Sequence, residues 1–463
     1  MRPSSSPSDG AGGPPAAGLF DAVLARGAVP ALVGDHALLQ AMLDAEAALA
    51  TGQARAGLVP GAHAEAITAA CRAEHFDVSA TGREAAASGN PVVPLARALT
   101  DLVRDHAGGE AAGWVHFGAT SQDILDTAMV LVTRNALHAI TGDLQDAAGT
   151  AAELARAHAT TLMPGRTLLQ QALPVTFGLK AAGWLVALED AAATLTTAAD
   201  GLPAQLGGAA GTLASLEQHG TAILGAYAEI LGLAEPVLPW HTARLPVATV
   251  ATAAGTAAGL IGKVALDVVL LAQTEVAEVV EDAAGRGGSS TMPHKRNPVA
   301  AVAAIAGARR TPGLVATLLA AMAQEHERAA GGWHAEWAPL RELLVATGSA
   351  ATWLADSLRS LRADPERMRA DLELTGGLLL AERITTALRP TLGRLAAHDL
   401  VETACQRAAS RQRTLLDELL DTPAVVEALG AERIRDLLDP AGYLGSTQEF
   451  IERALRRHAK GAR

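Results

Sequence analysis

The chain has 463 residues, with 37 Lys and Arg against 49 Asp and Glu, so its formal net charge is −12. This acidic balance argues against a nucleic acid or an anionic membrane as the main partner, but a locally basic pocket can still bind an anionic substrate. Hydrophobic residues make up 49% of the chain and aromatic residues only 3%, too few aromatics for a typical β-sandwich or barrel. Because abundant Ala and Leu favour closely packed helices, the composition predicts an all-α protein.

The two cysteines, Cys71 and Cys405, are too few for a disulfide framework or a Cys-rich metal site. No group of His, Asp and Glu has convincing metal-ligand spacing, so we expect neither a metal nor a cofactor. Residues 1–18 are of low complexity and lack the apolar core of a signal peptide. They predict a disordered tail on a cytoplasmic protein.

In chain order, the segments from about residue 20 to 110 are short, and the main one is a helix over 35–57. Long apolar-periodic stretches with few Gly or Pro follow at 121–159, 172–199, 247–283, 297–329 and 335–361. Helices of this length imply a bundle in which each helix crosses the whole domain. The last hundred residues return to shorter helices. We therefore expect an N-terminal helical domain at 19–112, a central bundle at 113–364 and a C-terminal helical domain at 365–463.

The stretch 247–283 has two notable features. It is apolar around most of its circumference, which predicts that neighbouring subunits cover part of it. Near its end, Glu275, Glu278 and Glu281 follow a helical spacing and predict a solvated stripe.

Three polar, glycine-containing segments interrupt the apolar background. The first, His-Phe-Gly-Ala-Thr-Ser-Gln-Asp at 116–123, lies where a loop enters a long helix, and its Thr and Ser suit both an N-cap and a carboxylate-binding turn. The second, Gly-Arg-Thr-Leu-Leu-Gln-Gln at 165–171, predicts only a polar turn by itself. The third, at 285–298, is a Gly-rich loop beside a proline, which can close over a ligand. It lacks the Gly-Lys-Ser/Thr order of a phosphate-binding loop.

The third segment contains Gly-Ser-Ser-Thr-Met-Pro-His-Lys-Arg-Asn-Pro at 288–298, which resembles the signature of the fumarase/aspartase superfamily. The first two segments fall where the other conserved regions of that superfamily lie, and the resemblance extends over nearly the whole chain. Phrases such as Gly-Gly-Ala-Ala-Gly-Thr-Leu at 207–213 and Gly-Trp-His-Ala-Glu-Trp at 332–337 resemble the 3-carboxy-cis,cis-muconate cycloisomerase subgroup. The resemblance implies a three-domain all-α fold that tetramerises into a twenty-helix core, with each active site assembled from three subunits.

The resemblance also implies a mechanism on a small di- or tricarboxylate. A proton is removed next to a carboxylate, an aci-carboxylate carbanion forms, and a β-substituent leaves. Ser289 is the implied base, which needs a stabilised alkoxide, and Lys295 is the implied catalytic cation beside the carboxylate that accumulates charge. The expected substrate contacts are Thr120, Ser121, Thr167, Gln170, Arg244, Met292 and Asn297, with Asn90, His241, Ser290 and His334 as further candidates.

One departure from the superfamily concerns the leaving group. Fumarase, aspartase and adenylosuccinate lyase carry His after the Thr of the second segment, paired with a Glu seven residues past the signature Lys. This chain has Leu168 and Val302 at those positions. Because that His serves the leaving-group side, its loss favours a group that departs as a stable anion, such as a carboxylate or nitrite.

A second departure concerns substrate charge. The cycloisomerase subgroup usually reads Trp-His-Thr-Gln-Arg-Asp-Arg before the long helix, and here 240–246 reads Trp-His-Thr-Ala-Arg-Leu-Pro. The loss of a cation suits a dicarboxylate better than a tricarboxylate. We therefore expect the elimination of nitrite from nitrosuccinate to give fumarate, with 3-carboxy-cis,cis-muconate cycloisomerase as an alternative of nearly equal weight. An adenylosuccinate lyase and a non-catalytic relative, such as the lens crystallins, are weaker alternatives.

Overall fold

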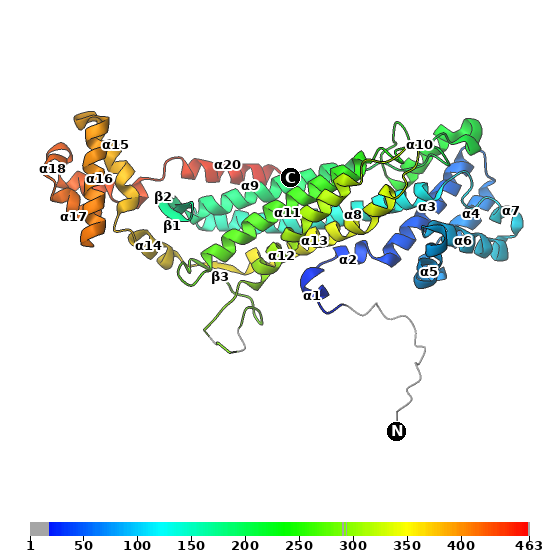
Figure 1. Cartoon of the computed structure of the whole chain (residues 1–463), viewed down its shortest axis with the longest axis horizontal. Helices are drawn as coiled ribbons and strands as arrows, with labels where there is room; N and C mark the ends of the chain where they lie inside the picture. The colour runs from blue at the N-terminus through cyan, green and yellow to red at the C-terminus, as the bar shows by residue number, and fades with distance from the viewer. Residues whose placement is uncertain (1–17, 289–290, 293, 462–463) are drawn as a thin grey trace, which may run out of the picture. The chain divides into compact units, whose positions relative to one another are not determined.

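The structure is a computed structural model that describes residues 18–288, 291–292 and 294–461. The expected disordered tail at 1–18 lies outside the described residues except for Gly18. The all-α fold predicted from composition is confirmed, since helices dominate the described residues and two small antiparallel sheets accompany them (Figure 1).

The chain divides into two compact units, each built from three stretches of sequence. Unit 1 consists of the residues up to Ala139 with 199–255 and 310–350, and unit 2 of 140–198, 256–309 and 351–463. Four long helices contribute residues to both units: α8 (Ser121–Ala157), α11 (Leu245–Leu271), α12 (Val299–Ala320) and α13 (Gly332–Ser360). The division into three domains expected from the sequence stays a prediction.

Unit 1 holds the shorter helices of the N-terminal part and α10. They are α1 (Asp21–Leu24), α2 (Val29–Leu32), α3 (Asp35–Arg55), α4 (Gly61–Ala70), η1 (Ala73–His75), α5 (Val78–Ser88), α6 (Val92–Ala107), α7 (Gly109–Ala112), η2 (Ala214–His219) and α10 (Gly220–Leu231). Leu43 and Leu49 of α3 are buried together with Ile67 of α4 and Leu99 of α6. The apolar residues recur at helical spacing, which is why these segments form helices that share one core.

Unit 2 holds the two sheets, α9 and the helices of the C-terminal region. They are β1 (Leu162–Thr167), β2 (Gln170–Thr176), α9 (Phe177–Asp200), β3 (Val279–Glu281), β4 (Leu361–Ala363), α14 (Pro365–Glu373), η3 (Leu378–Leu380), α15 (Ala381–Leu392), α16 (Arg394–Arg411), α17 (Leu415–Leu420), α18 (Pro423–Leu429), α19 (Ala431–Leu437), η4 (Pro440–Gly442) and α20 (Thr447–Gly461). Buried Ile384, Leu388, Val401, Leu415 and Leu419 form a separate apolar core for α15–α19.

The end of α11 differs from the sequence prediction. The helix ends at Leu271, and the chain then forms β3, which pairs with β4. Glu278 is fully buried, and the carboxylate of Glu281 accepts hydrogen bonds from the first amides of α12, at Ala300 and Ala301. The predicted solvated stripe is therefore wrong, because two of its three carboxylates have partners that are distant in sequence.

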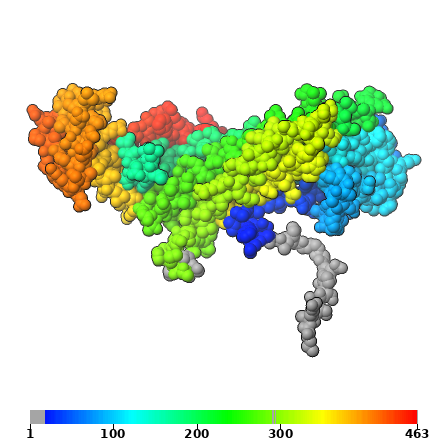
Figure 2. Space-filling view, in the orientation of Figure 1, coloured from blue at the N-terminus to red at the C-terminus, as the bar shows by residue number. Residues whose placement is uncertain are grey.

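Helix α11 is the one helix among the described residues that is long and apolar enough to cross a membrane, by length and composition alone. Buried residues such as Val250, Ala254 and Ile261 make it a core helix, but only 44% of its most apolar window is buried. Figure 2 shows the surface of the long helices, in green and yellow, uncovered on the viewed face.

The polar turn predicted at 165–171 is the tip of the β1–β2 hairpin. The register shifts between Pro164 and Arg166, so Gly165 forms a bulge, and a Cβ at Gly165 would lie 2.9 Å from the carbonyl oxygen of Leu173. The two turn residues are Leu168 and Leu169, both at positive φ (51° and 65°). A two-residue turn of this type is usually made by Asn and Gly, which is why the sequence did not predict a hairpin.

Candidate active site

The entry to α8 is organised around one buried carboxylate. Asp123 is fully buried in the first turn of the helix. It accepts hydrogen bonds from the backbone amides of Thr120, Gly207 and Gly208, each at 2.9 Å, and its fourth partner is His241 Nε2 at 2.7 Å. The carboxylate therefore ties the turn that carries the expected substrate contacts to two other segments of unit 1.

Glycines are required around this carboxylate. A Cβ at Gly207 would lie 2.8 Å from His241 Cε1, and a Cβ at Gly208, where φ is +69°, would lie 3.0 Å from the carbonyl oxygen of Gly118. His241 is buried, with 4% of its surface exposed. Its Nε2 is paired with Asp123, and its role as a substrate contact stays a prediction.

Arg244 also lies inside unit 1. Its Nη1 donates to Asp126 Oδ2 at 2.7 Å, its Nη2 to Glu336 Oε2 at 2.6 Å and its Nε to Glu336 Oε1 at 3.0 Å. Burial lowers the pKa of the guanidinium, but the charge of Asp126 and the hydrogen bonds to both carboxylates raise it above its ordinary value. Because it binds both neighbouring carboxylates, Arg244 stabilises the unit, and its role as a substrate contact stays a prediction.

A pair between half-buried His116 and buried Glu46, next to the α8 entry, was not predicted from the sequence. His116 Nδ1 lies 2.6 Å from Glu46 Oε1 on α3, and His116 has a positive φ of 58°. Burial lowers the pKa of His116, but the charge and hydrogen bond of Glu46 outweigh it, with help from Asp123, so the pKa is raised. A histidine whose pKa is raised and that lies four residues before Thr120 is a candidate for anion binding or proton transfer. His116 belongs to the first polar segment, which the sequence singles out, but its partner Glu46 lies 70 residues away in the sequence and could not be inferred from it.

The second segment presents Thr167 and Gln170 at the hairpin tip, where they pair with each other across the last rung of β1 and β2 and are exposed. The preceding residue, Arg166, points into unit 2. Its Nη1 and Nη2 bind the two oxygens of buried Glu278, each at 2.8 Å. Thr167 and Gln170 are therefore exposed to solvent, whereas the cationic side chain of Arg166 is bound to a buried carboxylate of unit 2.

The signature loop is described in part. Ser289 and Ser290 lie outside the described residues. Met292 and Lys295 are exposed, and the backbone amide of Asn297 donates to the carbonyl of Gly287 at 2.8 Å, while its side-chain amide donates to the same oxygen at 3.3 Å. Asn297 therefore joins the two ends of the loop that contains Ser289, the expected catalytic base, and Lys295, the expected cation.

The two remaining candidates, Asn90 and His334, lie in neighbouring segments of unit 1. Asn90 Oδ1 accepts from the amide of Val92 at 3.0 Å, and His334 Nε2 lies 3.0 Å from the carbonyl oxygen of Gly89. Unit 1 thus carries Asn90, Thr120, Ser121, His241, Arg244 and His334, and unit 2 carries Thr167, Gln170, Met292, Lys295 and Asn297.

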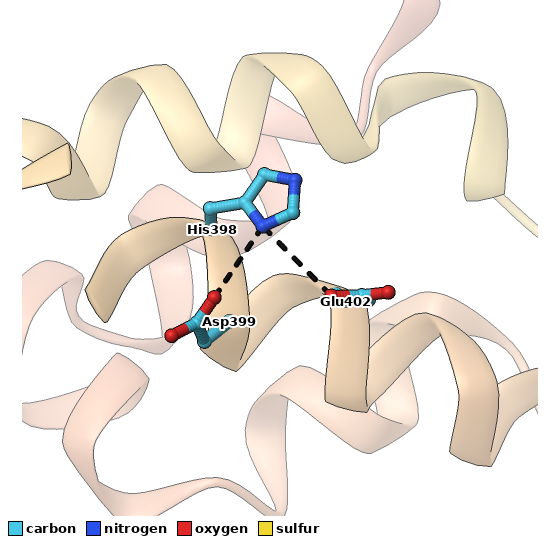
Figure 3. Close-up of side chains that lie close together, drawn as sticks. All are labelled: His398, Asp399 and Glu402. Atoms are coloured by element: carbon cyan, nitrogen blue, oxygen red, sulfur yellow. Dashed lines mark ion pairs between the residues drawn. The ribbon is translucent and has the colours of Figure 1, made fainter. Parts of the chain in front are cut away.

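One group of side chains among the described residues has ligand atoms close enough to hold a cation. His398, Asp399 and Glu402 lie on an exposed face of α16, with ligand atoms within 4.8 Å of one another (Figure 3). His398 Nδ1 lies 3.5 Å from Asp399 Oδ1 and 3.9 Å from Glu402 Oε2. His398 pairs with each of the two carboxylates, which accounts for the proximity of the three side chains, and α16 carries none of the segments described above.

Two family models together match most of this chain. Residues 26–313 match the family described as Lyase, and residues 377–454 match the adenylosuccinate lyase C-terminus family. The 3-carboxy-cis,cis-muconate cycloisomerase of Pseudomonas aeruginosa is 48% identical over 96% of this chain and 97% of its own length. The nitrosuccinate lyase of Streptomyces davaonensis is 45% identical over 95% of this chain and 94% of its own length.

Among solved structures, the 3-carboxy-cis,cis-muconate lactonizing enzyme of Pseudomonas putida matches with a TM-score of 0.90 and 43% identity, over 96% of this chain and 100% of that one. Matches of this identity and coverage show common ancestry as well as a common fold. The chain is an enzyme that belongs to the fumarase/aspartase superfamily of lyases.

Proposed function

We propose that this protein cyclises 3-carboxy-cis,cis-muconate to a lactone through a carbanion next to a carboxylate. The observation that carries the proposal is the full-length similarity to proteins of that name, in sequence at 48% identity and in structure at a TM-score of 0.90. From the sequence alone, nitrosuccinate was the expected substrate and 3-carboxy-cis,cis-muconate the alternative. The comparisons favour its alternative.

The chemistry fits the residues that this chain has and lacks. In lactone formation a carboxylate oxygen of the substrate adds to a carbon–carbon double bond, and a proton is delivered to the carbon beside another carboxylate. In the reverse direction that proton is removed and the carboxylate leaves as a stable anion, which needs little acid assistance. Leu168 in place of a histidine is compatible with this leaving group. Ser289 is the group that we assign to the proton transfer, with Lys295 stabilising the charge of the carbanion.

Two segments are suited to bind the other carboxylates. The turn at Thr120 and Ser121 opens α8, and a helix N-terminus offers backbone N–H groups to an anion. The tip of the β1–β2 hairpin adds the hydroxyl of Thr167 and the amide of Gln170, both exposed. We assign these four residues, with Met292 and Asn297, to the substrate site.

A second candidate reaction, elimination of nitrite from nitrosuccinate, is favoured by a specific observation. Arg244 is neutralised by Asp126 and Glu336, and Leu245 and Pro246 follow it in a region where a cation was expected from the subgroup. This region therefore supplies no spare positive charge for a third carboxylate. In this reaction a base removes a proton next to one carboxylate, the C–N bond breaks, and nitrite and fumarate are released.

The two reactions are separated by incubating the purified protein with each substrate. Lactone formation removes the conjugated diene, so the ultraviolet absorbance of the muconate falls, whereas nitrosuccinate elimination releases nitrite, which is measured colorimetrically. We expect turnover of the muconate with kcat/KM at least tenfold above that for nitrosuccinate. The opposite ratio supports the second candidate, and turnover of neither substrate contradicts both.

We further propose a cytoplasmic homotetramer in which three subunits contribute to each active site. The incomplete burial of apolar α11 supports a partner on that helix. Light scattering should give about 190 kDa, four times the 47.2 kDa of the chain. Mixing and refolding two inactive variants, Ser289→Ala and Thr167→Ala, should restore activity if the residues come from different subunits, and no recovery would contradict a shared site.

A further inference from the structure

A buried pair of carboxyl groups lies beside the hairpin in unit 2. The side chains of Glu278 and Asp371 are 0% and 1% exposed. Arg166 bridges them, with Nη2 2.8 Å from Glu278 Oε1 and 3.8 Å from Asp371 Oδ2. Burying charged groups is costly unless each has a partner, so an arrangement of two buried carboxyl groups next to an exposed hairpin needs a reason.

Both strands of the hairpin make hydrogen bonds to these two residues from the pair of positions next to the tip. Arg166 of β1 and Gln171 of β2 face each other in the register. Arg166 binds Glu278, and Gln171 Nε2 donates to the carbonyl oxygen of Asp371 at 2.9 Å. The bulge at Gly165 changes the direction of the strand just before Arg166.

The tip itself does not favour this hairpin. Leu168 and Leu169 both adopt positive φ, and their side chains are 95% and 73% exposed. Bulky residues in this conformation are strained, and apolar side chains in solvent contribute no compensating burial. The turn is therefore held by contacts outside its own sequence, made by Arg166 and Gln171, two residues before and two residues after the pair of leucines.

The charges around Glu278 reinforce this arrangement. Burial raises the pKa of Glu278, Arg166 lowers it in part, and the charge and hydrogen bond of Asp371 raise it again. Arg367 on α14 lies 3.0 Å from Asp371 Oδ1, and Lys180 on α9 interacts electrostatically with Glu278. The side chain of Glu278 is thus surrounded by groups from three elements, β1, α14 and α9.

We propose that Arg166, Glu278 and Asp371 form a clasp that positions Thr167 and Gln170 to bind the substrate. The three residues act through the hairpin and are positioning residues. The proposal rests on the proposed function, in which Thr167 and Gln170 contact a substrate carboxylate. It adds a specific cause for the orientation of these two side chains, which the sequence of the turn does not supply.

The test compares Glu278→Gln with Glu418→Gln in the full-length protein. Glu418 is a matched control, because it is also buried (1% exposed) and binds arginines, with Oε1 3.0 Å from Arg413 Nη1, but it lies in the separate core of the C-terminal helices. Amide hydrogen exchange is followed over 162–176, and KM and kcat are measured with the substrate that the wild type turns over. We expect Glu278→Gln to speed exchange in the hairpin and lower kcat/KM by about ten- to a hundredfold, and Glu418→Gln to change neither.

A second variant, Arg166→Lys, keeps the charge but cannot bind both carboxylate oxygens. We expect it to raise KM more than it lowers kcat and to speed exchange at the tip, with unchanged circular dichroism. If hairpin exchange and KM stay at wild-type values in both Glu278→Gln and Arg166→Lys, the clasp is wrong. The exchange measurement needs no turnover, so a wild type that is inactive on both substrates contradicts the proposed function and leaves the clasp to be decided by exchange alone.

Discussion

Two fully buried carboxylates, Asp123 and Glu278, lie behind two segments that we assign to the substrate, and they hold those segments differently. Asp123 accepts hydrogen bonds from three backbone amides and lies against one imidazole, with donor–acceptor distances between 2.7 and 2.9 Å. Glu278 is bound by Arg166, which also lies near a competing carboxyl group, Asp371. Four hydrogen bonds, three of them to the backbone, fix the turn around Asp123, whereas Glu278 is held by the side chain of a single arginine. The α8 entry is therefore the rigid segment of the two, and the hairpin is the adjustable one.

The largest effect is expected in the network behind the α8 entry. Arg244→Met would leave Asp126 and Glu336 buried without their cation, which costs about 3–5 kcal/mol of unfolding free energy. Urea denaturation measures it. Arg104→Met, which removes an exposed pair with Asp101, should cost less than about 1 kcal/mol. Similar losses in the two variants would contradict the structural role of Arg244.

A smaller effect is expected in the loop that leads into α8. Gly118 has a φ of +74°, and a Cβ there would overlap the buried side chain of Leu216. Gly118→Ala should therefore lower the unfolding free energy by about 2 kcal/mol. The control is Gly142→Ala in the interior of α8, where a Cβ meets nothing within 4 Å, and it should stabilise the protein by up to about 1 kcal/mol. Equal effects of the two variants would show that the loop is not tightly held.

In the β1–β2 hairpin, the strain of the turn at Leu168 and Leu169 can be removed by substitution. The double variant Leu168→Asn, Leu169→Gly places residues that accept positive φ at the tip and should raise thermal stability by about 1 kcal/mol. Differential scanning calorimetry measures it. Because the clasp below the tip is retained, hairpin amide exchange should not increase. A less stable protein would mean that the two exposed leucines make contacts of their own, for example with another subunit.

The smallest effect concerns pH. The pKa of His116 is raised above its ordinary value of 6.5 by Glu46, so the folded protein holds this proton more tightly than the unfolded chain does. The stabilisation is complete below pH 6.5 and is lost as pH rises through the higher folded-state pKa. His116→Gln should remove this decline between the two pKa values. Denaturation midpoints measured at pH 6 and pH 8 test it, and an unchanged pH dependence would contradict a charged His116.

Most of the fold could be predicted from the sequence, because helical periodicity is local. The long helices were predicted close to their observed bounds, such as 121–159 for Ser121–Ala157 and 335–361 for Gly332–Ser360. The failures involve partners that are distant in sequence. The predicted solvated stripe was wrong because Glu278 binds Arg166, which lies 112 residues away in the sequence. The carboxylate partners of Arg244 lie about 100 residues away and were not predicted, and its role as a substrate contact stays a prediction. The hairpin was missed because its turn is made of two leucines.

In the proposed reaction, catalysis passes through a carbanion next to a carboxylate, with Ser289 carrying the proton. Converting 3-carboxy-cis,cis-muconate in D₂O and examining the lactone by NMR tests this route. We expect one deuterium at the carbon beside the carboxylate, and no detectable turnover by Ser289→Ala in a folded protein. A lactone without deuterium, or wild-type turnover by the variant, would contradict it.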